Sequence, residues 1–235
     1  MGKQFRKYLQ ASLLLFGVFS LPFSAAAQTL IPFTLYWKNA TFILVSSDTL
    51  HGFASLTMPE DLIRLSQPDG SSATYLPSEV KSFIVEEPYN AVPFRRSGDL
   101  LLQNRRYGQY LWNRDKDFST YKAPALFVVV VPGKYALLLR EHKEQLQNAG
   151  GPTLAGQALG AAVSEAQKSP NAGVAERFYL SVDGQEVHWL RTYKKDLLAH
   201  FPGKEAVIKK FAQKYNLQFN RVDHLARIVA FCNTL

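Results

Sequence analysis

The chain has 235 residues, of which 47% are hydrophobic and 13% aromatic, and its formal net charge is +8 at pH 7. Such a composition is typical of a globular protein with a sizeable core, and it excludes an intrinsically disordered chain. The single cysteine excludes an internal disulfide framework, so we expect stability to come from side-chain packing.

Residues 1–27 have the pattern of a secretory signal peptide. The alternative, a transmembrane anchor, is disfavoured because the apolar run is shorter than the ~20 residues that span a bilayer. We therefore expect a protein that is cleaved before Gln28 and exported to the periplasm or the cell exterior, with no membrane span afterwards. The pattern consists of a positive start, an apolar stretch and a small-residue cleavage site: Lys3, Arg6 and Lys7, then 11–24, then 25–27.

Without this segment the formal charge is about +5, from 24 Lys and Arg against 19 Asp and Glu. The positive residues occur as separated pairs, whereas nucleic-acid binding needs them clustered, so we expect no nucleic-acid partner. An anionic partner of an exported protein would be envelope glycolipid or polysaccharide, or a protein, and the competing interpretation is a solvated face. The pairs are Arg95 with Arg96, Arg105 with Arg106, Lys194 with Lys195 and Lys209 with Lys210.

The region 28–145 is predicted to be rich in strands separated by turn residues. Because no helical pattern intervenes, we expect antiparallel pairing in a sandwich or a partly open barrel. In the last strand Tyr135, Leu137 and Leu139 alternate with Lys134, Ala136 and Arg140, which predicts that the second set faces water. The candidate strands are 41–46, 50–57, 62–67, 82–86, 99–103, 107–113, 125–131 and 135–142.

Gly, Ala, Ser and Gln dominate 146–175, which predicts a flexible insertion with a loosely docked helix at 153–168. After it, Asp183 and Gly184 separate two apolar runs, and a two-residue loop of this type closes a tight hairpin. That register places Phe178 opposite Trp189 on the core side.

The region 176–235 continues from this hairpin into helices predicted at 193–201 and 204–215 and near the C-terminus. Cys232 falls on the apolar face of the last one, which favours a buried, inert thiol over a link to a partner chain. We expect the lysines of the second helix to face water. The whole pattern indicates an α+β protein, with strands first and amphipathic helices last. The apolar stripes are Val207, Ile208, Phe211, Ala212 and Tyr215, then Val222, Leu225, Ile228, Val229 and Cys232.

No local motif predicts an enzyme. The signatures Gly-x-Ser-x-Gly, His-Glu-x-x-His, Cys-x-x-Cys and Gly-x-Gly-x-x-Gly are all missing from the sequence, so we expect neither a metal nor a cofactor. Paired carboxylates for glycoside chemistry remain an alternative that needs two acids in a common cleft. The candidates are Glu60 with Asp61, Glu86 with Glu87, and Asp115 with Asp117.

Aromatic rings next to guanidinium groups are the strongest candidates for ligand binding. Tyr107, Tyr110 and Trp112, with Arg105 and Arg114, lie on one predicted strand, and such groups suit sugar or peptide ligands. Tyr107 does not share the parity of the other two rings, so part of the set must face the core, and core packing is the favoured interpretation.

Three short segments form a recurring pattern: Ser-Asp-Thr-Leu-His-Gly at 47–52, a segment at 75–83 that contains Pro-Ser-Glu-Val, and the end of the last helix at 228–233. This pattern resembles that of secreted, functionally uncharacterised β-rich proteins of the Bacteroidota. The resemblance implies export and a β-rich N-terminal part, and it brings no known activity.

These observations favour a non-enzymatic, exported binding or envelope-associated module. The alternatives are a hydrolase that acts on envelope carbohydrate or peptide, and an assembly or adaptor subunit. A deep cleft with two inward carboxylates would favour the first alternative, and a large exposed apolar patch would favour the second.

Overall fold

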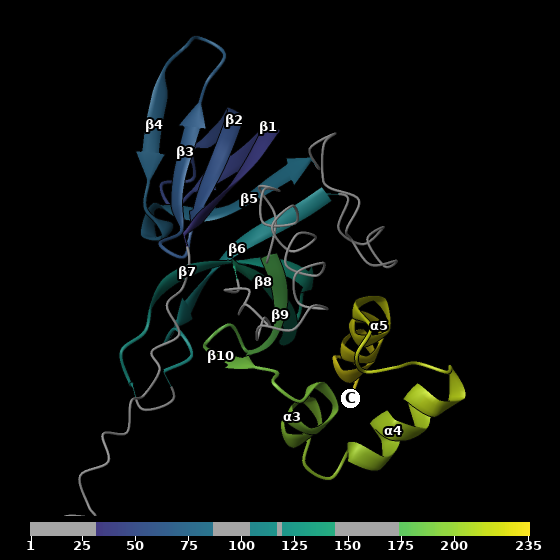
Figure 1. The fold of residues 1–235 in the computed structure, drawn as a ribbon. Coiled ribbons are helices and arrows are strands. Elements are labelled where there is room, and N and C mark those ends of the chain that lie inside the picture. The colour runs from purple at the N-terminus through teal and green to yellow at the C-terminus, as the bar shows by residue number, and fades with distance from the viewer. Residues whose placement is uncertain (1–31, 87–103, 117–118, 144–173) are drawn as a thin grey trace, which may run out of the picture.

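A computed structural model describes residues 32–86, 104–116, 119–143 and 174–235. Within these ranges, ten strands form one open antiparallel sheet and three α-helices follow it (Figure 1), which confirms the predicted α+β class. The strands are β1 (Phe33–Leu44), β2 (Thr49–Met58), β3 (Leu62–Ser66), β4 (Ser72–Tyr75), β5 (Val80–Glu86), β6 (Asn104–Trp112), β7 (Ala123–Val131), β8 (Tyr135–Lys143), β9 (Val174–Val182) and β10 (Glu186–Trp189). The helices are α3 (Tyr193–Ala199), α4 (Glu205–Lys214) and α5 (Val222–Cys232), and a short 3-10 helix, η1 (Pro77–Glu79), precedes β5.

The order of the strands in the sheet follows the chain except at one point. β5 does not pair with β4 but with β1, so the order is β10-β9-β8-β7-β6-β5-β1-β2-β3-β4. All the pairings are antiparallel, as expected from the lack of intervening helices. The single sheet therefore consists of β1–β4 at one end and β6–β10 at the other, joined by the pairing of β5 with β1.

Two strands extend beyond the predicted ranges or were not predicted. β1 begins eight residues before its predicted start, and a register shift between Trp37 and Ala40 hides the alternation there. β4 is a short edge strand of small polar residues and carries no apolar pattern. The predicted strand 99–103 and helix 153–168 lie outside the described residues, and the last two residues of the predicted insertion begin β9.

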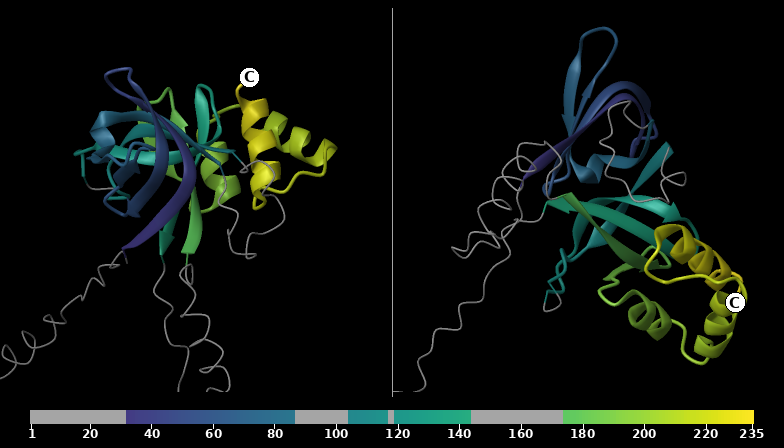
Figure 2. Two further views of the ribbon diagram at one scale, coloured as in Figure 1. Left: turned by 90° about the horizontal axis from the view of Figure 1, so that it is seen from above. Right: turned by 45° about the vertical axis from the view of Figure 1, so that its right-hand side comes forward.

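The sheet bends so that the β2–β3 turn reaches β7 and β8. Figures 1 and 2 show β1–β4 turned over from the strands β7–β10. The side chain of Asp61, which is fully buried, accepts hydrogen bonds from Arg140 Nη2 at 2.7 Å and from the Leu126 amide at 3.2 Å. Arg140 also donates to the carbonyl oxygens of Leu126 and Pro59, at 2.7 and 3.1 Å. This turn is therefore attached to β7 and β8 by a buried ion pair whose remaining polar atoms are bonded to the backbone.

Apolar side chains pack on both faces of β7–β9. One face joins the interior of the bent sheet to the helices, in a core that runs from Phe42 and Phe83 to Leu139 and Ile228. The opposite face carries a second, smaller cluster that we call the outer cluster, and it consists of Trp112, Ala125, Phe127, Ala136, Leu138 and Tyr179.

The prediction that β8 has one wet face is wrong. Seven consecutive residues of β8 are buried, and Ala136 and Arg140, which were expected to face water, lie on the side of the outer cluster. The guanidinium carbon of Arg140 is 4.8 Å from the Trp112 ring centroid and 5.4 Å from that of Phe127. The alternation of apolar and polar residues predicts the wrong exposure for Arg140, because an arginine in a strand can be buried when a carboxylate and aromatic faces surround it.

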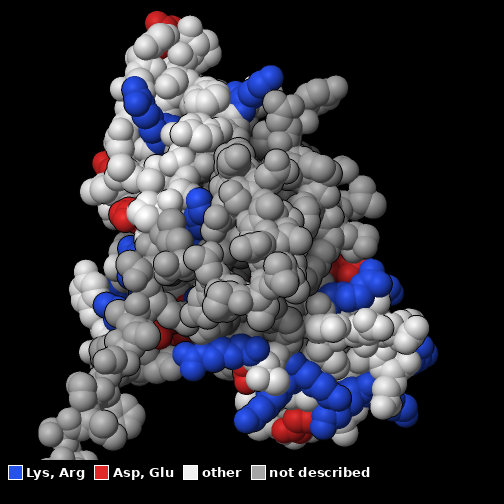
Figure 3. Space-filling model, in the orientation of Figure 1, with Lys and Arg blue, Asp and Glu red and all other residues white. Residues whose placement is uncertain are grey.

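Helix α5 packs on the main-core face of β7 and β8, and α4 packs on α5. On α4, Ile208 and Ala212 are buried as predicted, but Val207 and Tyr215 are 45% and 47% exposed, so the predicted stripe is only partly buried. The lysines of α4 are exposed, as expected, and Lys and Arg side chains gather over the helical part of the molecule (Figure 3). Among the described residues, no helix combines the length and apolar character of a membrane span.

The predicted burial of Cys232 is confirmed. Its side chain lies in the main core, 2% exposed, together with Leu225, Ile228 and Val229 of the same helix. Burial raises the pKa of the thiol to about 12. The thiol is therefore neutral at ordinary pH and has no access to a reagent.

We expect alkylation of Cys232 by iodoacetamide at pH 8 to be at least about a thousandfold slower in native buffer than in urea. The thiolate is the nucleophile, and the raised pKa lowers its population while burial blocks approach. Labelling followed by mass spectrometry gives both rates on the same protein. Equal rates in the two solvents would contradict the buried position.

Removal of the Asp61 carboxylate should destabilise the fold strongly. Asp61→Ala leaves Arg140 buried without its counter-charge, a change that typically costs about 3–5 kcal/mol of unfolding free energy. The matched control is Glu60→Ala, because Glu60 occupies the same turn but is exposed. Urea denaturation of the three proteins measures both effects, and a similar small loss for both variants would contradict the role given to the pair.

Candidate functional site

The β9–β10 hairpin has a different register from the predicted one. Trp189 pairs with Tyr179 and His188 with Leu180, one residue away from the expected partners. The loop contains three residues between the last pair, and the amide of Gln185 donates to the Val182 carbonyl at 3.0 Å. On its other edge β9 is paired along its whole length with β8. The three-residue loop, and not the expected two-residue loop, therefore accompanies the observed register of β10 against β9.

The shift moves Trp189 to the other face of the sheet. Side chains alternate along a strand, so a one-residue shift exchanges the faces of every residue in β10. Trp189 and Val187 pack against the outer cluster with Tyr179, whereas the predicted register would have placed them with Phe178 in the main core. The observed register therefore brings a half-buried indole next to the polar groups around Asp115.

Asp115 is the centre of a polar network beside the outer cluster. Its carboxylate accepts hydrogen bonds from the Tyr179 hydroxyl at 2.9 Å and from the Trp112 indole at 3.1 Å, and Arg177 Nη1 is 3.8 Å away. Burial raises the pKa of Asp115, while the two donated hydrogen bonds and Arg177 act to lower it. Burial and the Asp115 charge together raise the pKa of Tyr179. Two neutral donors therefore orient Asp115, and the charges of Arg177 and Arg191 act on it.

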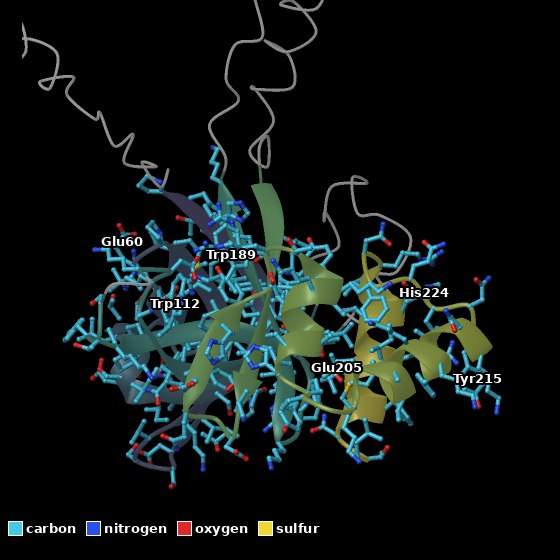
Figure 4. The ribbon with its side chains drawn as sticks, turned by 90° about the horizontal axis from the view of Figure 1, so that it is seen from below. Glu60, Trp112, Trp189, Glu205, Tyr215 and His224 are labelled. Atoms are coloured by element: carbon cyan, nitrogen blue, oxygen red, sulfur yellow. The ribbon has the colours of Figure 1, made fainter. Side chains whose placement is uncertain are left out.

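A hollow of about 280 Å³ opens beside this network. Trp189 lies on the rim of the hollow. Two guanidinium groups lie over its ring, that of Arg177 at 4.4 Å and that of Arg191 at 4.8 Å from the ring centroid. Figure 4 shows Trp189 and Trp112 on the same part of the molecule, away from α4 and α5. The lining residues come from the β6–β7 loop, β10 and the start of α3: Asn113, Asp115, Val187, His188, Trp189, Arg191 and Asp196.

One histidine, His188, lines the hollow, and its ring packs against that of His200 at the end of α3. The ring centroids of His188 and His200 are 4.6 Å apart, and His188 Nε2 is 3.1 Å from a Glu186 oxygen. Burial and the neighbouring His188 lower the pKa of His200. Within the described ranges, no group of three or more His, Cys, Asp or Glu side chains is arranged to hold a metal ion.

The carboxylates of the hollow are engaged by protein donors. Asp115 accepts the two hydrogen bonds described above, and Asp196 Oδ2 accepts the Thr192 amide at 2.6 Å. Of the acid pairs proposed from the sequence, Glu60 is exposed and Asp61 is buried in its ion pair. Glu87 and Asp117 lie outside the described residues. Both carboxylates that line the hollow are therefore held in place by protein hydrogen bonds.

The five sequence-predicted binding residues do not form one surface. Tyr107 is buried in the main core, where its ring stacks on Phe83 with centroids 4.4 Å apart. Arg105 is also buried on that face, in an ion pair with Glu141. Both residues are therefore separated by the sheet from the hollow.

The other three predicted residues lie near the outer cluster. Trp112 is buried and Tyr110 is half-buried against Phe127, with ring centroids 6.1 Å apart. Arg114 is exposed and donates to the Pro59 carbonyl at 3.0 Å. The parity argument separated Tyr107 from these rings correctly, and a ligand-binding role for the five residues stays a prediction.

Sequence reasoning missed Trp189, Arg177 and Arg191 as a group. The signal was present in Trp189-Leu190-Arg191, which places an indole and a guanidinium two residues apart at the end of an apolar run. The predicted hairpin register places the Trp189 indole in the core, and in that register the pattern does not indicate a site.

Comparison with protein-family models, with curated proteins and with solved structures found no match. The resemblance of the three short segments to secreted β-rich proteins stays a prediction. Export also stays a prediction, because the first 31 residues lie outside the described ranges.

Asp115→Asn should remove a pH dependence of stability. Because the folded-state pKa is raised, the folded protein binds the proton before the unfolded chain does as pH falls. Stability relative to the variant should therefore be greatest below about pH 4, near the ordinary pKa of Asp, and should decline as pH rises through the raised value. Urea denaturation between about pH 3 and pH 7 measures this difference.

The matched control is Asp69→Asn, for which the expected pH dependence of stability has the opposite sign. The hydroxyl and amide of Ser71 lower the pKa of Asp69, so its contribution to stability is present above the unfolded pKa and is lost as pH falls. Asp69→Asn should therefore lose stability relative to wild type as pH rises. The same direction for both variants would contradict the account of Asp115.

Proposed function

We propose that this protein is a non-enzymatic, exported binding module that holds a saccharide unit of the bacterial envelope against Trp189. The observation that carries the proposal is the half-buried Trp189 ring on the rim of a polar hollow, next to Arg177 and Arg191. Because Arg177 and Arg191 lie over the ring, the ligand would meet the ring edge and the two guanidinium groups, whose hydrogen-bond donors match the hydroxyl groups of a sugar. Export is the predicted property that would bring the module to such a ligand.

The size and charge of the hollow support a small polar ligand. Its volume of about 280 Å³ lies just below the roughly 300–1,000 Å³ of small-molecule pockets, so it suits one sugar unit of a longer chain. Arg191 and the two acids Asp115 and Asp196 line it together, and mixed donors and acceptors match hydroxyl groups better than one strong charge does.

A hydrolase is supported less well. Glycoside hydrolysis needs one acid that can transfer a proton and a second carboxylate on the other side of the bond. Asp115 and Asp196 both accept protein hydrogen bonds, and the Asp115 carboxylate is oriented by two donors. Asp115 and Asp196 are therefore better placed to orient a ligand than to transfer protons.

The test is binding of the purified protein to isolated peptidoglycan sacculi and to an array of bacterial envelope glycans. Trp189→Ala should lower the affinity for any bound glycan about tenfold, because an aromatic contact contributes about 1 kcal/mol beyond its buried area and the lost area adds to it. The matched control is Tyr121→Ala, since Tyr121 is 77% exposed and does not line the hollow.

Three results would contradict the proposal. They are no binding to any glycan, equal affinity of Trp189→Ala and wild type, and release of reducing ends during incubation, which would indicate a hydrolase. Circular dichroism of both variants separates a loss of binding from a loss of fold.

A further inference from the structure

Beyond residue 27, the net positive charge of this protein lies at its helical end. Residues 191–235 contain nine Lys and Arg against three acids, Asp196, Glu205 and Asp223, whereas 28–190 contain fifteen against sixteen. The blue side chains in Figure 3 accordingly gather over the helices. The sheet is therefore nearly neutral and the helical layer strongly basic.

Part of this basic region is apolar and exposed. Val207, Phe211 and Tyr215 follow one another at four-residue spacing along α4 and its C-cap, and we call this row with Phe231 the α4 aromatic face. The rings of Phe211 and Phe231 stack with centroids 3.9 Å apart, and Tyr215 lies 4.9 Å from Phe211. Val207 and Tyr215 remain nearly half exposed. The fold thus holds the row in place without covering it.

Two exposed lysines border the same face. Lys210 and Lys214 lie three and seven residues after Val207, positions that share one side of a helix. Lys214 Nζ is 5.3 Å from the Tyr215 ring centroid. Neither ammonium group is in an ion pair with a carboxylate among the described residues. The α4 aromatic face therefore combines exposed apolar groups with uncompensated positive charge.

We propose that the α4 aromatic face rests on an anionic lipid surface. The lysines would contact headgroup phosphates, while Val207 and Tyr215 enter the boundary with the acyl chains, the depth at which amphipathic helices and tyrosine rings lie. Lysine has a long apolar stem that suits this position, because the stem follows the apolar face while the charge stays at the headgroups. A purely electrostatic partner such as nucleic acid would not account for the exposed apolar row.

Docking in this way leaves the Trp189 hollow accessible. Figure 4 shows Tyr215 at the far end of the helices from Trp189 and Trp112. The inference stands independently of the proposed saccharide binding, because the two sites share no residue.

The test is flotation of the protein with vesicles of phosphatidylcholine alone and of phosphatidylcholine mixed equally with phosphatidylglycerol. Wild type should bind only the anionic vesicles, and binding should weaken between about 0.1 M and 0.5 M NaCl as salt screens the charges. Lys210→Ala with Lys214→Ala should weaken binding about 25-fold, roughly fivefold for each lysine at a lipid surface.

The matched control is Lys38→Ala with Lys81→Ala, which removes the same charge from exposed strand positions. It should bind as wild type does. Val207→Ser with Tyr215→Ser should weaken vesicle binding while leaving the net charge unchanged, which tests the apolar contribution separately.

Four outcomes would overturn the inference. Neutral vesicles could bind equally well, or the control pair could lose as much affinity as the α4 pair. The serine pair could bind as wild type does, which would indicate attraction to any polyanion. Binding to heparin that competes fully with vesicles and does not depend on Val207 and Tyr215 would assign the face to a soluble polyanion.

Discussion

The buried ion pair of Asp61 and Arg140 is the contact on which the shape of the molecule depends. It attaches the turn between β2 and β3 to β7 and β8, so the two ends of an open sheet are held around one core. Every polar atom that the pair brings out of water must be bonded, and the carbonyl of Leu126 and the carbonyl of Pro59 accept from Arg140. The pair therefore selects this bend, because a sheet that opened would leave both charges without their partners.

Arg140 also joins the β2–β3 turn to the outer cluster. Its guanidinium is paired with Asp61 and lies over the Trp112 and Phe127 rings. Trp112 in turn donates to Asp115, which receives the Tyr179 hydroxyl as well. Two rings of the outer cluster therefore hold Asp115 at the hollow, and one of them, Trp112, packs against Arg140. The hollow is therefore lined by side chains that packed rings and bonded charges hold in place.

The sheet and the helices differ in net charge and in the kind of surface that they expose. The strands provide the core, the bend and the Trp189 hollow at nearly zero net charge, while the helices carry the excess of lysine and arginine. The apolar face of α5 packs on the sheet and α4 packs on α5, with Ile208 and Ala212 buried and Val207 and Tyr215 turned outward. The separation of these regions in Figure 4 allows one molecule to have two surfaces of different chemistry.

The sequence by itself determined the α+β class, the antiparallel strands, the apolar face of α5 and the burial of Cys232, because these depend on local periodicity and on the lack of helical patterns between strands. Tertiary structure decided the pairing of β5 with β1, the burial of Arg140 and the register of β10. Each of these depends on groups distant in the chain: the carboxylate of Asp61 lies 79 residues from Arg140, and β8 pairs with β9 along its length. The Trp189 hollow belongs to this second group, because a hairpin with apolar side chains on both faces carries no pattern that distinguishes one register from the next.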